Sequence, residues 1–280
     1  GCAGGPALMR KNHISGLLLA GLAISTLLGV APTAQAAPAM SKRAAGATTS
    51  SSQIPRLASG KPDFSGVWQT LSEADYDLEP HAGRRDAPPS AGVVEGGQLP
   101  YLPDALAKKQ RNFAARAKDD PRLKCWSLGV PRSVYYPAPF QIFQRDRDLT
   151  LLHQLGHQVR TIHTNDTLHQ EEAEANFWLG DSRGHWEGDT LVVDVTEAND
   201  ETWLDRAGNY HSEELHIVER WSFIDKNTIS YSATIDDKQV FSRPWTINIV
   251  LNRREKGFEL IEDYCFTLPY EGYYPPKEGK

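Results

Sequence analysis

The residues best suited to chemistry lie in a polar loop between two strand-like segments. This loop brings Trp203, Asp205, His211 and His216 close together in the sequence. A His beside an Asp can be held in one tautomer and can transfer protons near neutral pH. Loop residues also owe less to core packing than strand residues do. We therefore interpret the two histidines as candidate catalytic residues, and Trp203 and Asp205 as candidate ligand contacts.

A second candidate is Glu219, in the predicted strand 214–224. Alternation along a strand places it on an apolar face with Leu215, Ile217, Trp221 and Phe223. Apolar neighbours disfavour the charged form of a carboxyl and raise its pKa, as a general acid or base requires. We expect Glu219 inside the fold, Trp221 in the wall that faces a ligand, and His211 or His216 close to the carboxyl. The alternative is that Glu219 sits near a strand end or pairs with an Arg.

Two further histidines and an arginine flank Gly156. His153 ends an apolar strand face in the expected strand 149–155, so it is either a catalytic candidate or a satisfied core histidine. His157 and Arg160 lie just beyond the turn and are candidate ligand contacts. A guanidinium offers a forked, permanently charged set of donors that could orient a carboxylate or a phenolate. The alternative for Arg160 is a surface ion pair.

Asp194 interrupts the apolar strand predicted at 190–196. It either points outward as an exposed carboxylate or points inward as a catalytic partner. His153 and His157 are four residues apart, but that spacing aligns ligands on a helix and these lie around a strand turn. The sequence contains no H-E-x-x-H, C-x-x-C or calcium loop, and no phosphate-binding or nucleophile-elbow motif. We therefore expect no metal and no cofactor.

The elements that must position these residues are mostly strands. Turn-forming residues separate the candidate strands, so consecutive strands are expected to be antiparallel neighbours. The one convincing helix is predicted at 104–118, with Pro103 in its first turn and Asp119-Asp120-Pro121 as its stop. The expected strands are 64–70, 140–144, 149–155, 158–164, 177–186, 190–196, 214–224, 228–235, 244–253 and 258–266.

Alternation with period two is clearest in the last third of the chain. Ile229, Tyr231, Ala233 and Ile235 share one face of their strand. About ten antiparallel strands would twist strongly, and closure would remove their exposed edges. We predict an all-β fold, an up-and-down barrel of the lipocalin type, with the helix packed outside or plugging one end.

The N-terminal part of the chain differs in composition from the rest. Residues 9–36 combine a basic start, an apolar run and the small-residue signal Ala34-Gln35-Ala36, which together indicate a secretory signal peptide cleaved near Ala36. Residues 1–8 are an upstream extension, 37–60 are expected to be a flexible tether, and 61–280 to be a single barrel domain. We expect a secreted or periplasmic protein.

The net charge limits the classes of binding partner, and the cysteine content suggests a disulfide. The net charge is −6, and it becomes −8 when Arg10 and Lys11 leave with the signal peptide. An acidic chain argues against nucleic acid and against an anionic membrane surface, and the apolar run is short for a stable membrane insertion. Cys125 and Cys265 remain after cleavage and are expected to form one disulfide; the alternative is two separate buried thiols. Nothing in the sequence predicts an oligomeric state.

Several motifs resemble those of known families. Gly66-Val67-Trp68 is similar to the G-x-W signature that opens lipocalins. A larger part of the chain resembles a family of secreted bacterial proteins, through G-K-P-D-x-S-G-x-W, W-E-G-D-T-L-V-V-D, W-L-D-x-x-G and H-S-x-x-L-H-x-x-E-R at residues 60–68, 186–194, 203–208 and 211–220. The resemblance spans nearly the whole mature chain. It implies a barrel and a location in the cell envelope, and it implies no particular chemistry.

Two functions from different classes follow. The first is a cofactor-independent acid–base enzyme, a lyase, isomerase or hydratase, acting on a small apolar or aromatic molecule in the barrel mouth. The second is a non-catalytic binding protein for a small hydrophobic ligand, which a barrel alone would allow. The concentration of His, Asp and Glu between residues 153 and 219 favours the enzyme, because a binding protein needs the aromatic side chains but not several titratable groups.

Overall fold

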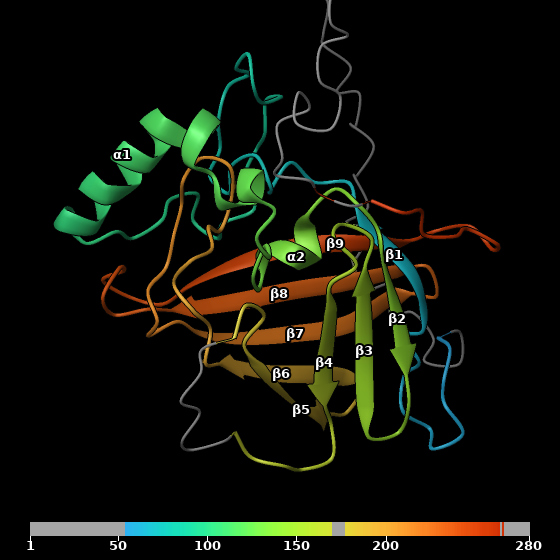
Figure 1. Ribbon diagram of the computed structural model, residues 1–280. Coiled ribbons are helices and arrows are strands. Elements are labelled where there is room, and N and C mark those ends of the chain that lie inside the picture. Colours follow the sequence, from blue (N-terminus) through green and yellow to red (C-terminus); the bar gives the residue numbers. More distant parts are fainter. Residues whose placement is uncertain (1–53, 170–176, 264, 266–280) are drawn as a thin grey trace, which may run out of the picture. The chain divides into compact units, whose positions relative to one another are not determined.

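The computed structural model describes residues 54–169, 177–263 and 265. The expected signal peptide and most of the expected tether lie outside these residues. Within them the chain forms a closed barrel (Figure 1). The strands are Gly66–Thr70 (β1), Phe140–Gln144 (β2), Asp148–His153 (β3), Val159–His163 (β4), Asp181–Glu187 (β5), Thr190–Thr196 (β6), His216–Asp225 (β7), Thr228–Asp236 (β8) and Trp245–Arg253 (β9).

The barrel closes between its first and last strands. β1 pairs antiparallel with β9, and every other strand pairs with the next one along the chain. All of these ladders are antiparallel except the one between β4 and β5, which is parallel and has only two registered pairs, Ile162 with Ser182 and His163 with Arg183. In Figure 1, β2 to β4 cross steeply in front of β6 to β9.

The predicted all-β barrel is confirmed, but two details of its strands were wrong. The barrel has nine strands rather than ten, because residues 258–263 form no strand and contribute only an isolated bridge at Asp263. It is also not wholly antiparallel. β4 ends at His163 and β5 begins at Asp181, so the connection is much longer than a hairpin turn, as a parallel neighbour requires.

Alternating apolar side chains fill the barrel. Along β8, Ile229, Tyr231, Ala233 and Ile235 are fully buried, and the residues between them are not. β9 alternates in the same way, so these two neighbouring strands contribute adjacent parts of the core. Because a strand's side chains alternate between its two faces, this pattern fixes which residues point into the lumen. The face predicted for β8 is confirmed.

The predicted helix is confirmed as α1 (Pro103–Asp119), which lies outside the barrel (Figure 1). Its side chain Asn112 donates a hydrogen bond to the carbonyl of Gly208, in the loop after β6. Two shorter helices were not predicted: η2 (Pro121–Lys124) and α2 (Arg132–Tyr135). Four residues are too few to show a helical period, so the sequence carries no signal for them.

A buried ionic cluster ties the loops on one side of the barrel together. Arg132 Nε donates to Asp75 Oδ1 at 2.8 Å and its Nη1 to Asp120 Oδ1 at 3.2 Å. Arg206 Nε donates to the second oxygen of Asp75 at 2.5 Å. All but Arg206 are almost completely buried. The cluster therefore joins the segment after β1, the end of α1, α2 and the loop after β6 as one packed unit.

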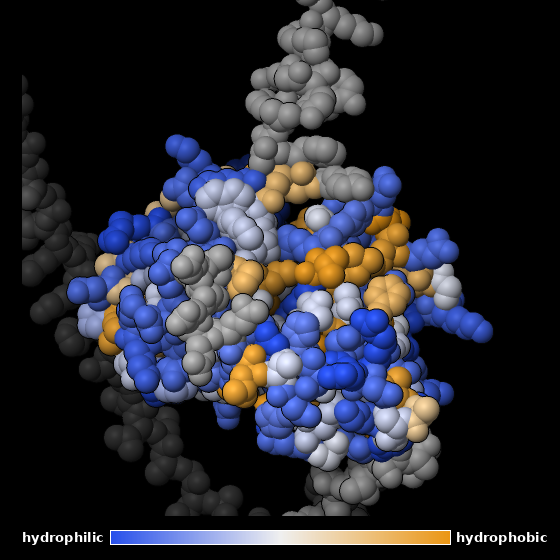
Figure 2. Space-filling view, turned by 60° about the horizontal axis from the view of Figure 1, so that its bottom comes forward, coloured by the Kyte–Doolittle hydropathy of each residue, from blue (hydrophilic) through white to orange (hydrophobic). Residues whose placement is uncertain are grey.

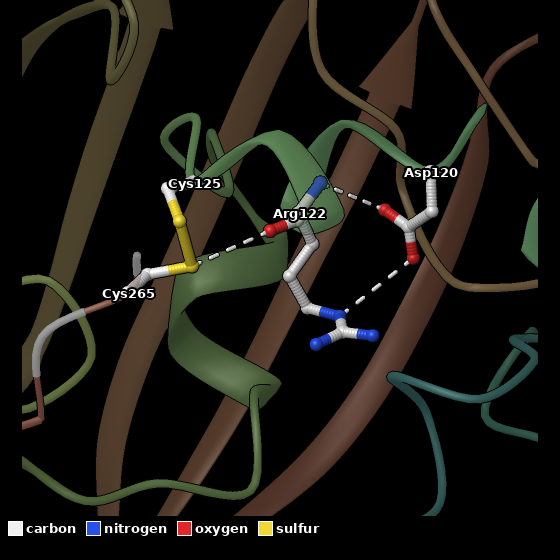
Figure 3. The surroundings of a disulfide bond; sticks show 4 residues. All are labelled: Asp120, Arg122, Cys125 and Cys265. Atoms are coloured by element: carbon white, nitrogen blue, oxygen red, sulfur yellow. Dashed lines mark hydrogen bonds and ion pairs between the residues drawn. A yellow bond between two sulfur atoms is a disulfide. The ribbon is translucent and has the colours of Figure 1, made fainter. Parts of the chain in front are cut away.

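Cys125 and Cys265 form the expected disulfide, with their Cα atoms 5.2 Å apart (Figure 3). Cys125 follows η2, and the cross-link ties this region to the chain beyond β9 across 140 residues. The surrounding turn is held by Asp120, whose Oδ1 accepts a hydrogen bond from the backbone N–H of Arg122.

The outer surface is mainly polar. On the face in Figure 2, charged and polar residues predominate and apolar residues gather in a band between them. Among the described residues, Leu168, Phe177 and Trp178 are large apolar side chains that remain exposed. No helix in this part of the chain is long and apolar enough to cross a membrane.

Candidate functional site

Glu219 lies inside the barrel, as predicted, and is completely buried. Its two carboxylate oxygens accept hydrogen bonds from Arg160 Nη1 at 3.0 Å and Nη2 at 2.6 Å. The hydroxyl of Tyr231 donates to the same carboxylate at 2.7 Å, and Arg160 Nε donates to Ser182 Oγ at 3.0 Å. The carboxylate is therefore neutralised by a bidentate partner and closed off from solvent.

The predicted partnership of Glu219 with a histidine was wrong. His216 lies on the opposite face of β7, because residues three apart in a strand point in opposite directions. His211 is buried in the loop before β7, where its Nε2 contacts Thr202 Oγ1 at 2.7 Å. Arg160 takes the place that was expected for a histidine. It is 2% exposed, so its guanidinium is committed to Glu219 and cannot serve as a ligand contact in this conformation.

His153 and Trp221 also belong to the filled interior. Burial, and then the positive charge of Arg160, lower the pKa of His153 to about 3, so the ring is neutral. Within the described residues, His153 Nε2 and Trp221 Nε1 have no hydrogen-bond partner. The Trp221 ring packs edge-on against Tyr231, with centroids 4.7 Å apart. Neither side chain faces an open cavity, and both act as core residues here.

Most of the polar loop after β6 is buried rather than open. Asp205 is completely buried and accepts hydrogen bonds from the backbone N–H of Leu78 and from both the backbone and the side chain of Asn209. Burial, and then the nearby Asp77, raise the pKa of Asp205 to about 7. Trp203 packs against the core. Asp205, His211 and Trp203 therefore hold the loop together, and the structure does not bring them to a surface where a ligand would meet them.

The open cluster of titratable groups lies instead on the outer face of β5, β6 and β7. His169 Nδ1 contacts Asp181 Oδ2 at 2.8 Å, and its Nε2 contacts Asp194 Oδ1 at 2.9 Å. The other oxygen of Asp194 contacts His216 Nε2 at 2.8 Å. We call these four residues, His169, Asp181, Asp194 and His216, the outer relay. It brings together two of the predicted site residues, Asp194 and His216.

Strand register positions the outer relay. Asp194 on β6 is opposite Arg183 on β5, and its outward orientation is one of the two that the sequence allowed. Arg183 Nε donates to Asp181 Oδ2 at 2.8 Å. Burial alone would raise the pKa of Asp181, but the hydrogen bonds from Arg183 and His169 outweigh it, and the pKa lies below its usual value. Asp181 is therefore a stable carboxylate that orients the His169 ring.

Two hollows give solvent and small molecules access to the outer relay. The larger, of about 340 Å³, is lined by Asp166, Thr167, Leu168, His169, Arg183, Gly184, His185 and Asp194. The smaller, of about 160 Å³, is lined by Glu214, His216, Asp236 and Lys238. The side chains of His216, Asp194 and His169 are 43%, 39% and 26% exposed. The outer relay thus combines short hydrogen bonds with direct access from two sides.

His169 and Asp181 are the outer relay residues that the sequence interpretation missed. His169 lies between two expected strands, in a segment without alternation, and no motif marks it. The available signal was the one used for His211, a loop histidine next to strands rich in Asp. His157 sits in the turn between β3 and β4, with a φ of 51°, away from the outer relay residues that line the two hollows.

In the described part of the chain, no three His, Cys, Asp or Glu side chains form a group that could hold a metal ion. The imidazole and carboxylate side chains of the outer relay can transfer protons and make hydrogen bonds. In comparisons with known proteins, the chain matches no family model and no curated protein.

Proposed function

We propose that the protein is a cofactor-independent acid–base enzyme, a lyase, isomerase or hydratase, whose reacting groups are those of the outer relay. The observation that carries this proposal is the unbroken contact chain from Asp181 through His169 and Asp194 to His216, open to a hollow of about 340 Å³. Glu219 and Arg160, which the sequence favoured, are paired inside the barrel. They support the fold behind the outer relay.

Proton positions in the outer relay explain how it would work. An imidazole nitrogen and a carboxylate oxygen at 2.8–2.9 Å need one proton between them. Asp194 makes two such contacts, so it is flanked by two imidazoles that can each hold or release a proton. In this scheme Asp194 removes a proton from the substrate, and His216 returns a proton from the other side. His169 donates to both Asp181 and Asp194 and so holds the base in place. Asp181 fixes the ring of His169 through Nδ1.

The lining of the hollow also limits the size and polarity of the substrate. Leu168 is 84% exposed and contributes an apolar side chain to the lining. A small, largely apolar molecule with an acidic C–H, or with a double bond that can be hydrated, fits this combination of an apolar wall and a titratable edge. Aromatic and aliphatic carbonyl compounds belong to this class.

A binding protein for a small hydrophobic ligand is the second candidate, and the exposed Leu168 beside the hollow favours it. A ligand in the lumen, as in lipocalins, is the less favourable form of this function, since Trp221, Tyr231 and Phe140 fill the interior near Glu219.

For location, we propose export through the predicted signal peptide to a secreted or periplasmic site. The disulfide supports an oxidising compartment.

Exchange of carbon-bound hydrogen in D₂O tests the enzyme directly. Small carbonyl and unsaturated compounds are incubated with the protein, and loss of proton signals is followed by NMR. Asp194→Asn and His216→Gln should each lower the exchange rate by about 10²-fold or more, the usual scale for losing a general acid or base. Asp189→Asn is the matched control, because Asp189 lies in the adjacent turn and pairs with Arg56.

The two candidate functions give different results. An enzyme shows exchange that the outer relay variants abolish and the control keeps. A binding protein retains a ligand in native mass spectrometry, shows no exchange with any compound, and loses affinity rather than rate in the variants. Exchange that survives in Asp194→Asn would contradict the assignment to the outer relay.

A further inference from the structure

A third hollow lies on the other side of Arg183, between the outer faces of β4 and β5. Its volume is about 280 Å³, close to the lower end of the range for ligand pockets, which suits one small ligand. Its lining is mixed: an aromatic ring, hydroxyls, an imidazole, a guanidinium and two carboxylates. The lining residues are Thr161, His163, Phe177, Gly180, Asp181, Ser182, Arg183 and Glu197.

The aromatic ring and one carboxylate are held together by the backbone. The N–H of Phe177 donates to the carbonyl of Glu197 at 2.7 Å, and the N–H of Asn199 donates to the carbonyl of Phe177 at 3.0 Å. Gly180 makes this docking possible: its φ is +63°, and a Cβ there would lie 2.7 Å from the carbonyl oxygen of Thr196. Phe177 and Glu197 are therefore fixed at the same wall before any ligand arrives.

The charges in this hollow are only partly paired. Asp181 is neutralised by Arg183 and His169. In the described part of the chain, the side chains of Glu197 and His163 make no hydrogen bond or ion pair, although both line the hollow. One unpaired carboxylate disfavours an anionic ligand. The guanidinium of Arg183 in the same wall disfavours a cation.

The remaining class is neutral, with both an apolar face and many hydroxyls. A pyranose ring has this chemistry: its C–H face packs on an aromatic ring, and its hydroxyls can donate to carboxylates and an imidazole and accept from a guanidinium. Phe177 is 45% exposed, and its neighbour Trp178 packs against Trp126 with ring centroids 5.5 Å apart. These two indoles extend the aromatic surface beyond Phe177.

We propose that the hollow between β4 and β5 binds a neutral saccharide, with Phe177 as the stacking platform and Glu197 and His163 as hydroxyl acceptors. This site is separate from the proposed proton-transfer chemistry and does not depend on it. Arg183 lines both this hollow and the larger hollow beside the outer relay.

Saturation-transfer NMR on the full chain tests the proposal with defined probes. The panel is methyl β-D-glucopyranoside, methyl α-D-mannopyranoside and methyl β-D-galactopyranoside, with tetramethylammonium as the cationic comparison. At least one glycoside should receive saturation at its ring C–H protons. Phe177→Ala and Glu197→Gln should each weaken that binding by tenfold or more.

Two controls separate this site from the rest of the surface. Phe143→Ala removes an equally exposed ring, 49% exposed, from β2 and should leave glycoside binding unchanged. Asp194→Asn should also leave it unchanged, even where it abolishes hydrogen exchange. Glu197→Asn serves if Glu197→Gln fails to fold, since Asn tolerates the positive φ of 59° at this position.

Three results would overturn the proposal. The first is no saturation transfer to any glycoside of the panel. The second is transfer that persists unchanged in both Phe177→Ala and Glu197→Gln. The third is binding of tetramethylammonium without binding of the glycosides, which would make the hollow a cation site.

Discussion

Arg160 on β4 and Glu219 on β7 meet inside the barrel, although β5 and β6 lie between their strands in the sheet. A buried charge is costly unless it is paired and fully hydrogen-bonded. Here the two charges pair with each other, and Ser182 and Tyr231 supply the further hydrogen bonds. Burial, followed by the Glu219 charge, raises the pKa of Tyr231, so its hydroxyl stays a donor. The network favours one arrangement of β4, β5, β7 and β8, because any shift in register would leave a charge unpaired.

Removing one member of this pair should be far more damaging than removing both. Glu219→Gln leaves the buried guanidinium of Arg160 without its counter-charge and should lower the free energy of unfolding by about 3–5 kcal/mol. The double variant Glu219→Leu/Arg160→Met removes both charges and should recover most of that loss. Urea unfolding followed by tryptophan fluorescence measures both. The control Glu187→Gln, in an exposed pair with Arg220, should leave the midpoint close to that of the wild type.

His153 should make stability fall in acid. Its pKa is about 3 in the folded chain and about 6.5 when unfolded, so the unfolded state binds the proton more tightly. The stability that the neutral ring contributes is fully present above pH 6.5 and is lost as pH falls toward 3, by about 1.4 kcal/mol per pH unit. The difference in unfolding free energy between the wild type and His153→Phe, measured from pH 4 to 7, should show this slope. A constant difference would contradict it.

Asp205 should act in the opposite direction over almost the same window. Its pKa is raised to about 7 in the folded chain from about 3.9 unfolded, so its contribution is present below pH 3.9 and is lost as pH rises through 7. The two groups therefore offset each other in the wild type. His153→Phe should be less stable at pH 6.5 than at pH 4, relative to wild type, and Asp205→Asn should show the reverse. Stability differences that change with pH in the same direction in both variants would contradict these two assignments.

For single residues, the sequence predicts which face of a strand a side chain lies on, but it does not predict which distant residue that side chain contacts. Alternation alone places Glu219 in the lumen and His216 outside it. The partner of Glu219 is 59 residues away on another strand, so only the closure of the barrel reveals it. His169 joins the outer relay for the same reason, because its contacts reach two strands that follow it in the sequence.

At the element scale, the docking of α1 depends on one glycine. Gly208 has a φ of +81°, and a Cβ at this position would lie 2.6 Å from Asn112 Cβ and 2.9 Å from its backbone carbon. Neither neighbour is the end of a flexible side chain, so the helix would have to move. The loop that carries Gly208 also contains Asp205, which links the position of α1 to the buried network beneath it.

Gly208→Ala should therefore loosen α1 specifically. We expect faster hydrogen exchange across residues 103–119 and a loss of stability larger than the roughly 1 kcal/mol of backbone strain alone. Gly257→Ala is the matched control, because Gly257 has a similar φ of +89° with open space around it. Equal effects of the two substitutions on α1 exchange would contradict the docking role.

The sequence also predicted elements better than their connections. Strands 140–144 and 190–196 and the helix agree with the structure almost residue for residue. The parallel pair of β4 and β5 was missed because short turns elsewhere suggested a continuous meander. The gap between the two expected strands was too long for a hairpin turn, and this length was the physical signal of a crossover.

At the scale of the whole molecule, the disulfide links the region beside η2 to the end of the barrel sequence. Closing a loop of 140 residues restricts the unfolded chain and should contribute about 2–5 kcal/mol. Cys125→Ser/Cys265→Ser should lower the urea midpoint by a corresponding amount, and adding reductant to the wild type should reproduce that shift. Reductant should not change the midpoint of the double variant. An unchanged midpoint in the reduced wild type would contradict a stabilising role.

The short parallel ladder between β4 and β5 has a consequence for self-association. A closed barrel has no edge strand, and an edge strand is what another chain needs to continue a sheet. Two registered pairs hold this ladder closed, whereas its antiparallel counterparts hold longer stretches. Opening it would convert the barrel into an open sheet with β4 at one edge and β5 at the other, and each edge could template intermolecular strand addition. Resistance to aggregation therefore depends on the weakest ladder of the barrel, and Arg160, on β4, reinforces it from inside through its hydrogen bond to Ser182 on β5.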